Sequence, residues 1–171
     1  MSLAWWSRLG VSLRGLVPFT LGLVFVFITV APWRLPGLDP VMPMFALTAV
    51  FYWSVYRPDW LPYTATFTLG LIQDLLSGTP IGMTALIFLV VQAVVVSQRR
   101  FFLKRSFLVM WWGFVMVAPA AAFTGWFVSS LVYGGVVPVE PVIVQLLLTV
   151  LFYPPLTWIL GRFHNLITDH A

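Results

Sequence analysis

The chain has 171 residues, of which 61% are hydrophobic and only 8% carry a charge, against about 25% charged residues in a typical soluble protein. Nine Lys and Arg with five Asp and Glu cannot cover a water-exposed surface of this size, so a water-soluble globular enzyme is excluded and most of the exterior must face lipid. The net charge of +4 does not imply nucleic-acid binding, because the densest basic cluster, from Arg99 to Arg105, lies between apolar runs, as juxtamembrane charges do.

The first 15 residues are predicted to form an amphipathic helix at the membrane interface. Apolar side chains recur there at spacings of three and four residues, while Arg8 and Arg14 fall elsewhere. The repeating residues are Leu3, Trp6, Leu9, Leu13 and Leu16. A disordered basic leader is the alternative. The apolar run that follows has no A-x-A pattern at its end, so a cleaved signal peptide is not expected.

Six apolar segments, separated by Pro, Gly or charged residues, form a predicted transmembrane domain over residues 16–161. They cover residues 16–33, 41–56, 60–76, 80–97, 106–133 and 138–161. A bilayer crossing needs about 20 residues, and backbone groups in hydrocarbon must be hydrogen-bonded internally. We therefore expect an all-α protein, a compact bundle of six transmembrane helices. The second and third segments are short, so a re-entrant hairpin is an alternative to two full crossings. Residues 162–171 are the expected cytoplasmic tail.

Basic residues predict the orientation of these segments. Six crossings place both termini on one side, and eight of the nine Lys and Arg residues then fall on the side of the termini. They are Arg8, Arg14, Arg57, Arg99, Arg100, Lys104, Arg105 and Arg162, whereas only Arg34 lies on the other side. By the positive-inside rule the termini are cytoplasmic. The expected cytoplasmic loop between the fourth and fifth segments carries Arg99, Arg100, Lys104 and Arg105.

Asp74 is a charged residue near the end of an otherwise apolar third segment. A carboxylate in a membrane helix costs free energy and normally has partners or a task. It is followed by a tight link containing Gly78, Pro80 and Gly82. We expect Asp74 to accept hydrogen bonds from backbone N–H groups of this link or of the next helix start, as a structural latch. A proton, ion or substrate site is the alternative.

Two further stripes predict close helix packing. Ala121, Gly125 and Ser129 repeat every four residues and give the fifth segment a small-xxx-small face. On the sixth segment a polar stripe has the same spacing. It comprises Gln145, Thr149, Tyr153 and Thr157. These faces are expected to pack against helices, either within the bundle or in a partner's transmembrane segment, and a cavity lining is the alternative.

The chain offers no recognisable catalytic set. It has no cysteine, which excludes disulfides and thiolate metal sites, and both nucleotide-binding glycine motifs are absent. His164 and His170 with Asp169 have metal-ligand chemistry, but we expect them to belong to a solvated C-terminus. No enzyme activity, metal or cofactor is therefore expected.

These features together resemble one protein family. A chain of about 170 residues with six spans and the pattern G-x3-D-x3-G-x-P-x-G, here Gly70, Asp74, Gly78, Pro80 and Gly82, resembles the rod shape-determining protein MreD family. Members of that family also look like the substrate-binding membrane subunits of energy-coupling-factor vitamin transporters. The resemblance implies a compact six-helix bundle in the bacterial inner membrane.

The resemblance also implies a role and partners. It implies a non-catalytic scaffold of the cell-elongation complex that binds the bitopic protein MreC and works with MreB, RodA and a class B penicillin-binding protein in lateral peptidoglycan synthesis. Our hypothesis is that small or polar helix faces receive the transmembrane helix of MreC, while the basic loop meets anionic lipid or a cytoplasmic partner. The alternative is the solute-binding membrane subunit of a vitamin transporter, with Asp74 or Gln145 at its site.

Overall fold

The computed structural model describes residues 3–31, 41–103 and 106–168, with side chains over residues 16–31, 41–102 and 106–164. The described residues form six α-helices and no strand. The helices are α1 (Leu3–Val30), α2 (Phe45–Tyr56), α3 (Tyr63–Ser77), α4 (Met83–Leu103), α5 (Phe107–Val132) and α6 (Val139–Thr168). The predicted all-α fold with six helices is confirmed.

Several helices extend beyond the predicted apolar segments. Helix α1 is continuous from Leu3 through Pro18, so residues 3–15 and the first apolar segment form one helix; the interfacial position of its first part stays a prediction. Helix α4 continues to Leu103 and α6 to Thr168. Hydropathy marks where the hydrocarbon ends, whereas a helix continues as long as its residues tolerate the conformation, and Arg and Gln are good helix formers.

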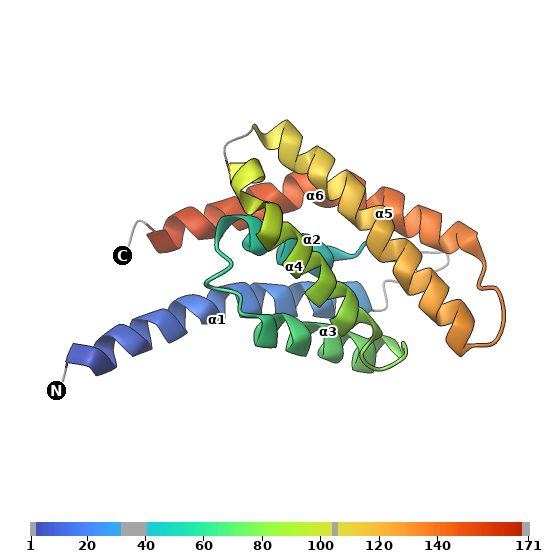
Figure 1. The fold of residues 1–171 in the computed structure, drawn as a ribbon, viewed down its shortest axis with the longest axis horizontal. Coiled ribbons are helices and arrows are strands. Elements are labelled where there is room, and N and C mark those ends of the chain that lie inside the picture. The colour runs from blue at the N-terminus through green and yellow to red at the C-terminus, as the bar shows by residue number, and fades with distance from the viewer. Residues whose placement is uncertain (1–2, 32–40, 104–105, 169–171) are drawn as a thin grey trace.

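Helix α2 forms the centre of the bundle. It contacts α1, α4, α5 and α6, and Figure 1 shows it enclosed by its neighbours. Its 12 residues span about 18 Å, and ten of the 12 are buried. A helix that is apolar on every side is stable only when it is enclosed. Because α2 is shorter than the roughly 30 Å of bilayer hydrocarbon, it is a core helix and does not cross a bilayer at full length.

Among the residues that the structure describes, three helices are long and apolar enough to cross a membrane, judged by length and composition. These are α4, α5 and α6. Two shorter apolar helices are the part of α1 whose side chains are described, Leu16–Val30, and α2. The protein is therefore a helical membrane protein in which three long helices and α1 surround the short α2, with α3 packed against α1 and α4.

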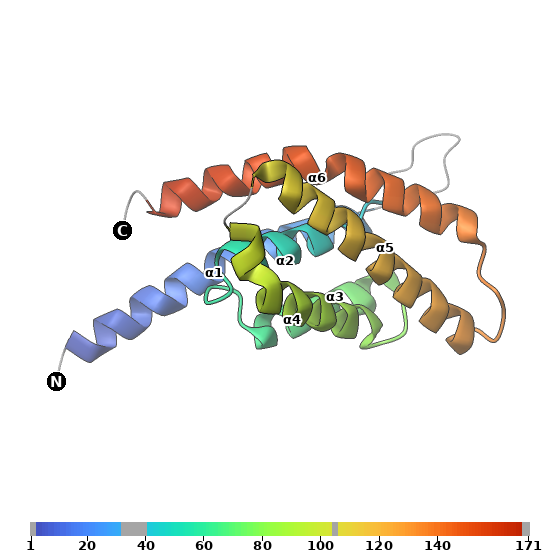
Figure 2. The ribbon, with the colours of Figure 1, turned by 45° about the horizontal axis from the view of Figure 1, so that its top comes forward.

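The chain runs back and forth along one direction, so the links alternate between two ends. Both ends of the chain lie at the same end of the bundle, together with the α2–α3 link and the last turn of α4 (Figures 1 and 2). We call this the terminal end. The end of α1, the start of α2, and the α3–α4 and α5–α6 links lie at the opposite end, which we call the far end (Figure 1). Arg57, Arg99, Arg100 and Arg162 belong to segments at the terminal end, whereas Glu140 begins α6 at the far end.

Candidate functional site

The carboxylate of Asp74 joins α3 to the start of α4. Its side chain is fully buried, and it accepts hydrogen bonds from the Thr79 hydroxyl at 2.8 Å and from the Gly82 N–H at 2.9 Å. The Thr84 N–H lies 3.0 Å and 3.1 Å from the two carboxylate oxygens. Asp74 therefore caps the first turn of α4 from a neighbouring helix, and both of its oxygens have donors.

The local sequence explains why the chain turns back onto Asp74. Helix α3 ends at Gly78, which has a left-handed conformation with φ of 68°, and Gly82 has φ of 92° just before α4. Non-glycine residues rarely adopt such angles. The first N–H groups of a helix have no partner within it, and the positive end of the helix dipole favours an anion there. The link thus presents the α4 N-terminus to Asp74.

Gly70 sets the distance between α3 and α4. A Cβ atom added at Gly70 would overlap the Cα atom of Ala85 and lie 2.6 Å from its backbone nitrogen. Backbone atoms cannot move aside as the tip of a flexible side chain can. Gly70, Asp74, Gly78 and Gly82 therefore act in one place, the contact and the link between α3 and α4. Pro80 lies in that link, and its carbonyl accepts the Met83 N–H at 3.1 Å.

The small face of α5 is turned to α4 inside the bundle. Ala121 is buried, and the Ser129 hydroxyl donates to the Met83 sulfur at 3.6 Å. A Cβ atom added at Gly125 would lie 3.6 Å from the Ile87 Cδ1 atom, which is an ordinary contact. The closest backbone approach is at Gly70 and not on this face.

The polar stripe of α6 holds the segment that leads into α2. Gln145 donates from Nε2 to the Met42 carbonyl at 2.9 Å, and the Met44 N–H donates to the Thr149 hydroxyl at 2.9 Å. Tyr153 is buried, with its ring stacked 4.4 Å from that of Phe114. Both predicted packing faces thus contact residues of the bundle itself, and Ala121, Gly125, Ser129 and Gln145 also line a cavity between the helices.

Gln92 is a structural residue that our sequence analysis did not identify. It is buried in the middle of α4 and donates from Nε2 to the Leu61 carbonyl at 2.7 Å. This bond ties the α2–α3 link to α4. A signal was present, because Gln92 interrupts an apolar run from Ala85 to Val96, and a buried polar residue in a membrane helix needs a partner.

The expected basic loop is partly helical. Arg99 and Arg100 belong to the end of α4, so the interpretation of a four-residue basic loop was wrong for these two. Lys104 and Arg105 lie outside the described residues. Helix α4 continues beyond its apolar part because Arg and Gln have high helix propensity.

His164 does not belong to a solvated tail, and that expectation was wrong. Because α6 continues past residue 161, His164 reaches the end of α2 and the α2–α3 link. Its ring stacks at 5.8 Å on the rings of Trp53 and Trp60. His170 and Asp169 lie outside the described residues. Within the described ranges, no three His, Cys, Asp or Glu side chains gather to hold a metal ion.

A cavity of about 660 Å³ with several polar lining residues, which we call the polar cavity, lies among the six helices. Its walls include four of the residues predicted to pack helices, and also Gln73, which precedes Asp74. The four are Ala121, Gly125, Ser129 and Gln145. Further polar lining residues are Thr29, Ser77, Thr79, Thr84 and Trp126. The cavity brings together side chains as far apart in sequence as Thr29 and Gln145, so spacing alone gave no signal for it.

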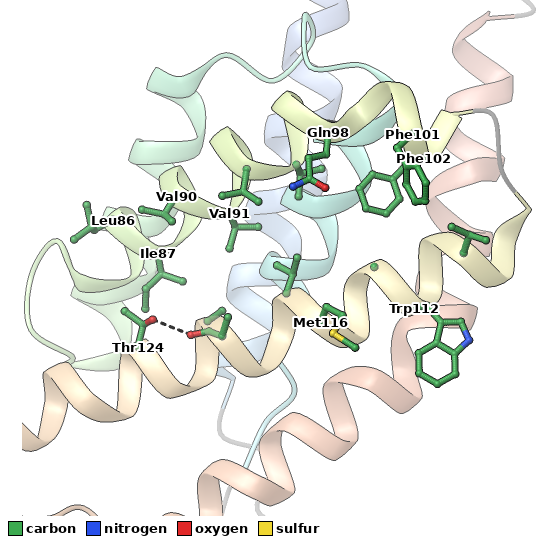
Figure 3. A pocket seen from close by; sticks show the side chains of 17 residues that line it. Leu86, Ile87, Val90, Val91, Gln98, Phe101, Phe102, Trp112, Met116 and Thr124 are labelled. Carbon is green, nitrogen blue, oxygen red and sulfur yellow. Dashed lines mark hydrogen bonds between the residues drawn. The ribbon is translucent and has the colours of Figure 1, made fainter.

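An apolar groove of about 580 Å³ runs between α4 and α5 on the outside of the bundle. Figure 3 shows a row of side chains on α4 facing others on α5. Leu86, Val90 and Trp112 are largely exposed, whereas Val95 and Phe102 are buried beneath them. Exposed apolar residues are normal in a membrane chain, so the sequence carried no sign that these formed a groove.

The comparisons with known proteins identify a family and nothing narrower. No curated protein and no solved structure gives a significant match, so the expected likeness to energy-coupling-factor subunits stays a prediction. A family model described as rod shape-determining protein MreD matches residues 10–163. This match covers most of the chain, including the α3–α4 latch, the polar cavity and the apolar groove. The chain therefore belongs to the MreD family of rod shape-determining membrane proteins.

Proposed function

We propose that this protein is a non-catalytic scaffold subunit of the cell-elongation complex and that the apolar groove holds the transmembrane helix of MreC. The observation that carries the proposal is the groove itself. The two faces that the sequence suggested for a partner, on α5 and α6, are turned to other helices of the bundle or to the cavity between them. A partner helix needs a face that the other helices of the bundle do not cover. The groove between α4 and α5 is such a face, because it lies on the outside of the bundle.

The length of the groove favours a transmembrane helix over a lipid. Its α4 wall extends from Leu86 to Phe102, a distance of about 24 Å along a helix. The hydrocarbon core is about 30 Å thick, so the groove covers most of it. An acyl chain of one leaflet reaches only about half of that thickness, whereas a spanning helix lies along the whole groove.

Small side chains on the α5 wall favour close approach by a helix. Ala120 and Thr124 are exposed, lie four residues apart and line the groove. The Thr124 hydroxyl is bonded to the Ala120 carbonyl at 2.8 Å, so it needs no partner. In membranes, helices associate through small residues that permit close van der Waals packing.

The proposed cellular setting follows from the charge distribution and the family. Basic residues gather at the terminal end, so we place both termini in the cytoplasm by the positive-inside rule, with several crossings of the bacterial inner membrane. In this position the groove would keep MreC beside MreB, RodA and a class B penicillin-binding protein during lateral peptidoglycan synthesis. Arg99, Arg100, Lys104 and Arg105 would face anionic lipid or a cytoplasmic partner.

Co-purification with MreC tests the groove. We expect Ala120→Trp to fill it and to reduce recovery of MreC at least tenfold. Leu151→Trp is the matched control, because Leu151 is 69% exposed on α6 and does not line the groove. If Ala120→Trp has normal thermal stability and recovers as much MreC as the unaltered chain, the groove does not bind MreC.

Complementation in rod-shaped cells tests the role. Depletion of the protein should produce rounding and lysis, which the unaltered chain and Leu151→Trp prevent and Ala120→Trp does not. Cells that keep their shape but require a vitamin would instead indicate transport. Neutralising the four basic residues from Arg99 to Arg105 then tests whether they only set the orientation of the protein or also bind a partner. Loss of rod shape with unchanged topology would indicate a partner at the terminal end.

A further inference from the structure

We infer that a third open space, at the terminal end of the bundle, binds an anionic phospholipid, with one acyl chain inside it and the phosphate at its mouth. This space has a volume of about 360 Å³ and lies between α2, α5 and α6. We call it the aromatic crevice, because five of its nine described lining residues are aromatic. It shares no lining residue with the apolar groove or the polar cavity, and the inference does not depend on MreC binding.

The length and position of the aromatic crevice match one leaflet of a bilayer. Its α6 wall runs from Tyr153 to Gly161, which is about 12 Å along a helix. Its α5 wall, from Phe107 to Met110, is the first turn of that helix, at the terminal end (Figure 1). Half of the hydrocarbon core is about 15 Å thick. The crevice is therefore too short for a spanning helix, whereas an acyl chain of the leaflet at the terminal end has the right length.

The inner walls of the crevice suit a hydrocarbon chain. The ring of Tyr153 is stacked 6.2 Å from that of Phe107 and 4.4 Å from that of Phe114, so this wall is a continuous aromatic surface. The Thr157 hydroxyl already donates to the carbonyls of Tyr153 and Pro154, at 3.0 Å and 2.9 Å. Such walls hold an apolar chain through many van der Waals contacts.

Three tyrosine hydroxyls add hydrogen-bonding capacity to these apolar walls. The hydroxyls of Tyr52, Tyr56 and Tyr153 make no hydrogen bond with a described residue, and none of the three oxygens is sealed in the interior. A Cβ atom added at Gly161 would lie 3.6 Å from the Tyr52 hydroxyl oxygen, which places this hydroxyl at the end of the crevice nearer to the terminal end. A tyrosine hydroxyl in an apolar surrounding normally has a partner, and an ester or phosphate oxygen of a lipid provides one.

The charges beside the mouth of the crevice favour an anionic lipid. Arg162 directly follows Gly161 and is exposed, and Arg57 directly follows Tyr56. Among the described residues at the terminal end, Asp59 is the only carboxylate. Basic sites between membrane helices bind anionic lipid headgroups. The ammonium group of a zwitterionic headgroup would be repelled by the arginines, so we expect a phosphate without such a group.

Lipid binding by the purified full chain tests this inference. The probes are dioleoyl phosphatidylglycerol, which is anionic, and dioleoyl phosphatidylcholine, which is zwitterionic and has the same acyl chains. Native mass spectrometry in detergent gives the affinity for the first lipid bound. Gly161→Leu fills the mouth of the crevice, and Leu151→Trp is its control, because Leu151 is exposed on the same helix and does not line the crevice. Arg162→Gln removes a charge that Arg162→Lys keeps. Tyr52→Phe combined with Tyr56→Phe removes two hydroxyls and keeps both rings.

We expect the unaltered chain to bind phosphatidylglycerol at least fivefold more tightly than phosphatidylcholine. Gly161→Leu should weaken binding of both lipids at least fivefold, whereas Leu151→Trp should not. Arg162→Gln should at least halve the preference for phosphatidylglycerol, which Arg162→Lys should retain. The double tyrosine variant should weaken binding of both lipids at least twofold, and it provides the test if Gly161→Leu fails to fold. Equal affinity of the unaltered chain for the two lipids would overturn the inference. Unchanged phosphatidylglycerol binding in folded Gly161→Leu protein, or in the double tyrosine variant, would also overturn it.

Discussion

A carboxylate inside an apolar bundle is stable only when donors surround its oxygens, and Asp74 satisfies this condition with groups that follow it by only five to ten residues. The latch is therefore local in sequence although it joins two helices. Gly70, one turn earlier, removes the side chain that would hold those helices apart. Residue by residue, the α3–α4 contact needs a small residue, an anion and two glycines in left-handed conformations.

Removing the Asp74 carboxylate should destabilise the bundle. Asp74→Ala leaves the buried N–H groups of Gly82 and Thr84 without acceptors, and we expect a loss of about 3 kcal/mol in the free energy of unfolding. Asp74→Asn keeps one acceptor oxygen and should lose about half as much. Thermal unfolding in detergent measures both, with Asp59→Asn as the control because Asp59 is exposed. Equal midpoints for Asp74→Ala and Asp59→Asn would contradict the latch.

Two glycine substitutions should differ although both glycines lie at helix contacts. Gly70→Ala forces a methyl group onto the Ala85 backbone and should cost about 2–3 kcal/mol, as overpacked cores do. Gly125→Ala places its methyl at ordinary distance from Ile87 and should change stability by less than about 0.5 kcal/mol. The same unfolding assay compares them, and a tolerated Gly70→Ala would show that α3 and α4 lie further apart than described here.

At the scale of elements, long helices hold a short one in place. Helix α2 is buried on all sides and its N-terminal cap residue, Met44, makes no side-chain cap bond. The Thr149 hydroxyl of α6 instead receives the Met44 N–H and donates to the Gln145 carbonyl. At the other end of α2, Gln92 of α4 holds the following link. The position of α2 thus depends on polar groups from α4 and α6.

The Thr149 bond can be removed with little change of shape. Thr149→Val replaces the buried hydroxyl by a methyl group and leaves the Met44 N–H unpaired, so we expect a loss of about 1–2 kcal/mol. Thr124→Val is the matched control, because that exposed hydroxyl bonds only to its own helix. Native-state hydrogen exchange should locate the effect at the start of α2. Equal exchange in both variants would mean that α6 does not hold this segment.

At the scale of the whole molecule, the links between helices alternate between two ends, and the described basic residues lie at one of them. Described basic residues belong to segments at the terminal end, and the polar cavity has walls from the start of α4 and the end of α5, near the far end (Figure 1). The apolar groove connects the two regions along α4 and α5. Ile87 of α4 and Ala121 of α5 line both the groove and the cavity, so the two open spaces are separated by the contact between these helices.

Single cysteines in intact cells should reveal the orientation. We expect Val136→Cys, in the α5–α6 link, to react with a membrane-impermeant maleimide added from outside. Arg162→Cys, exposed at the terminal end, should react only after the membrane is opened, because positive segments stay cytoplasmic. The reverse labelling pattern would show that the protein has the opposite orientation, with the polar cavity near the cytoplasmic side.

The fold was largely predictable because its causes are local. Apolar composition requires helices in lipid, and six apolar segments became six helices. Asp74 was recognisable because a charge in an apolar run needs partners close by. The ends of α1, α4 and α6 were misplaced because hydropathy does not report where a helix stops. His164 was misplaced for the same reason, since the length of α6 decides which rings it meets.

The sequence alone therefore determined that this protein lies in lipid, that it is helical, which family it resembles, and that Asp74 binds the link that follows it. Each of these depends on residues close together along the chain. Tertiary structure decided which faces of α5 and α6 are occupied, that α2 lies at the centre, and that a groove and a cavity remain open. These properties arise from distances between segments far apart in sequence, and an apolar side chain has the same hydropathy whether it meets lipid, a neighbouring helix or an open groove.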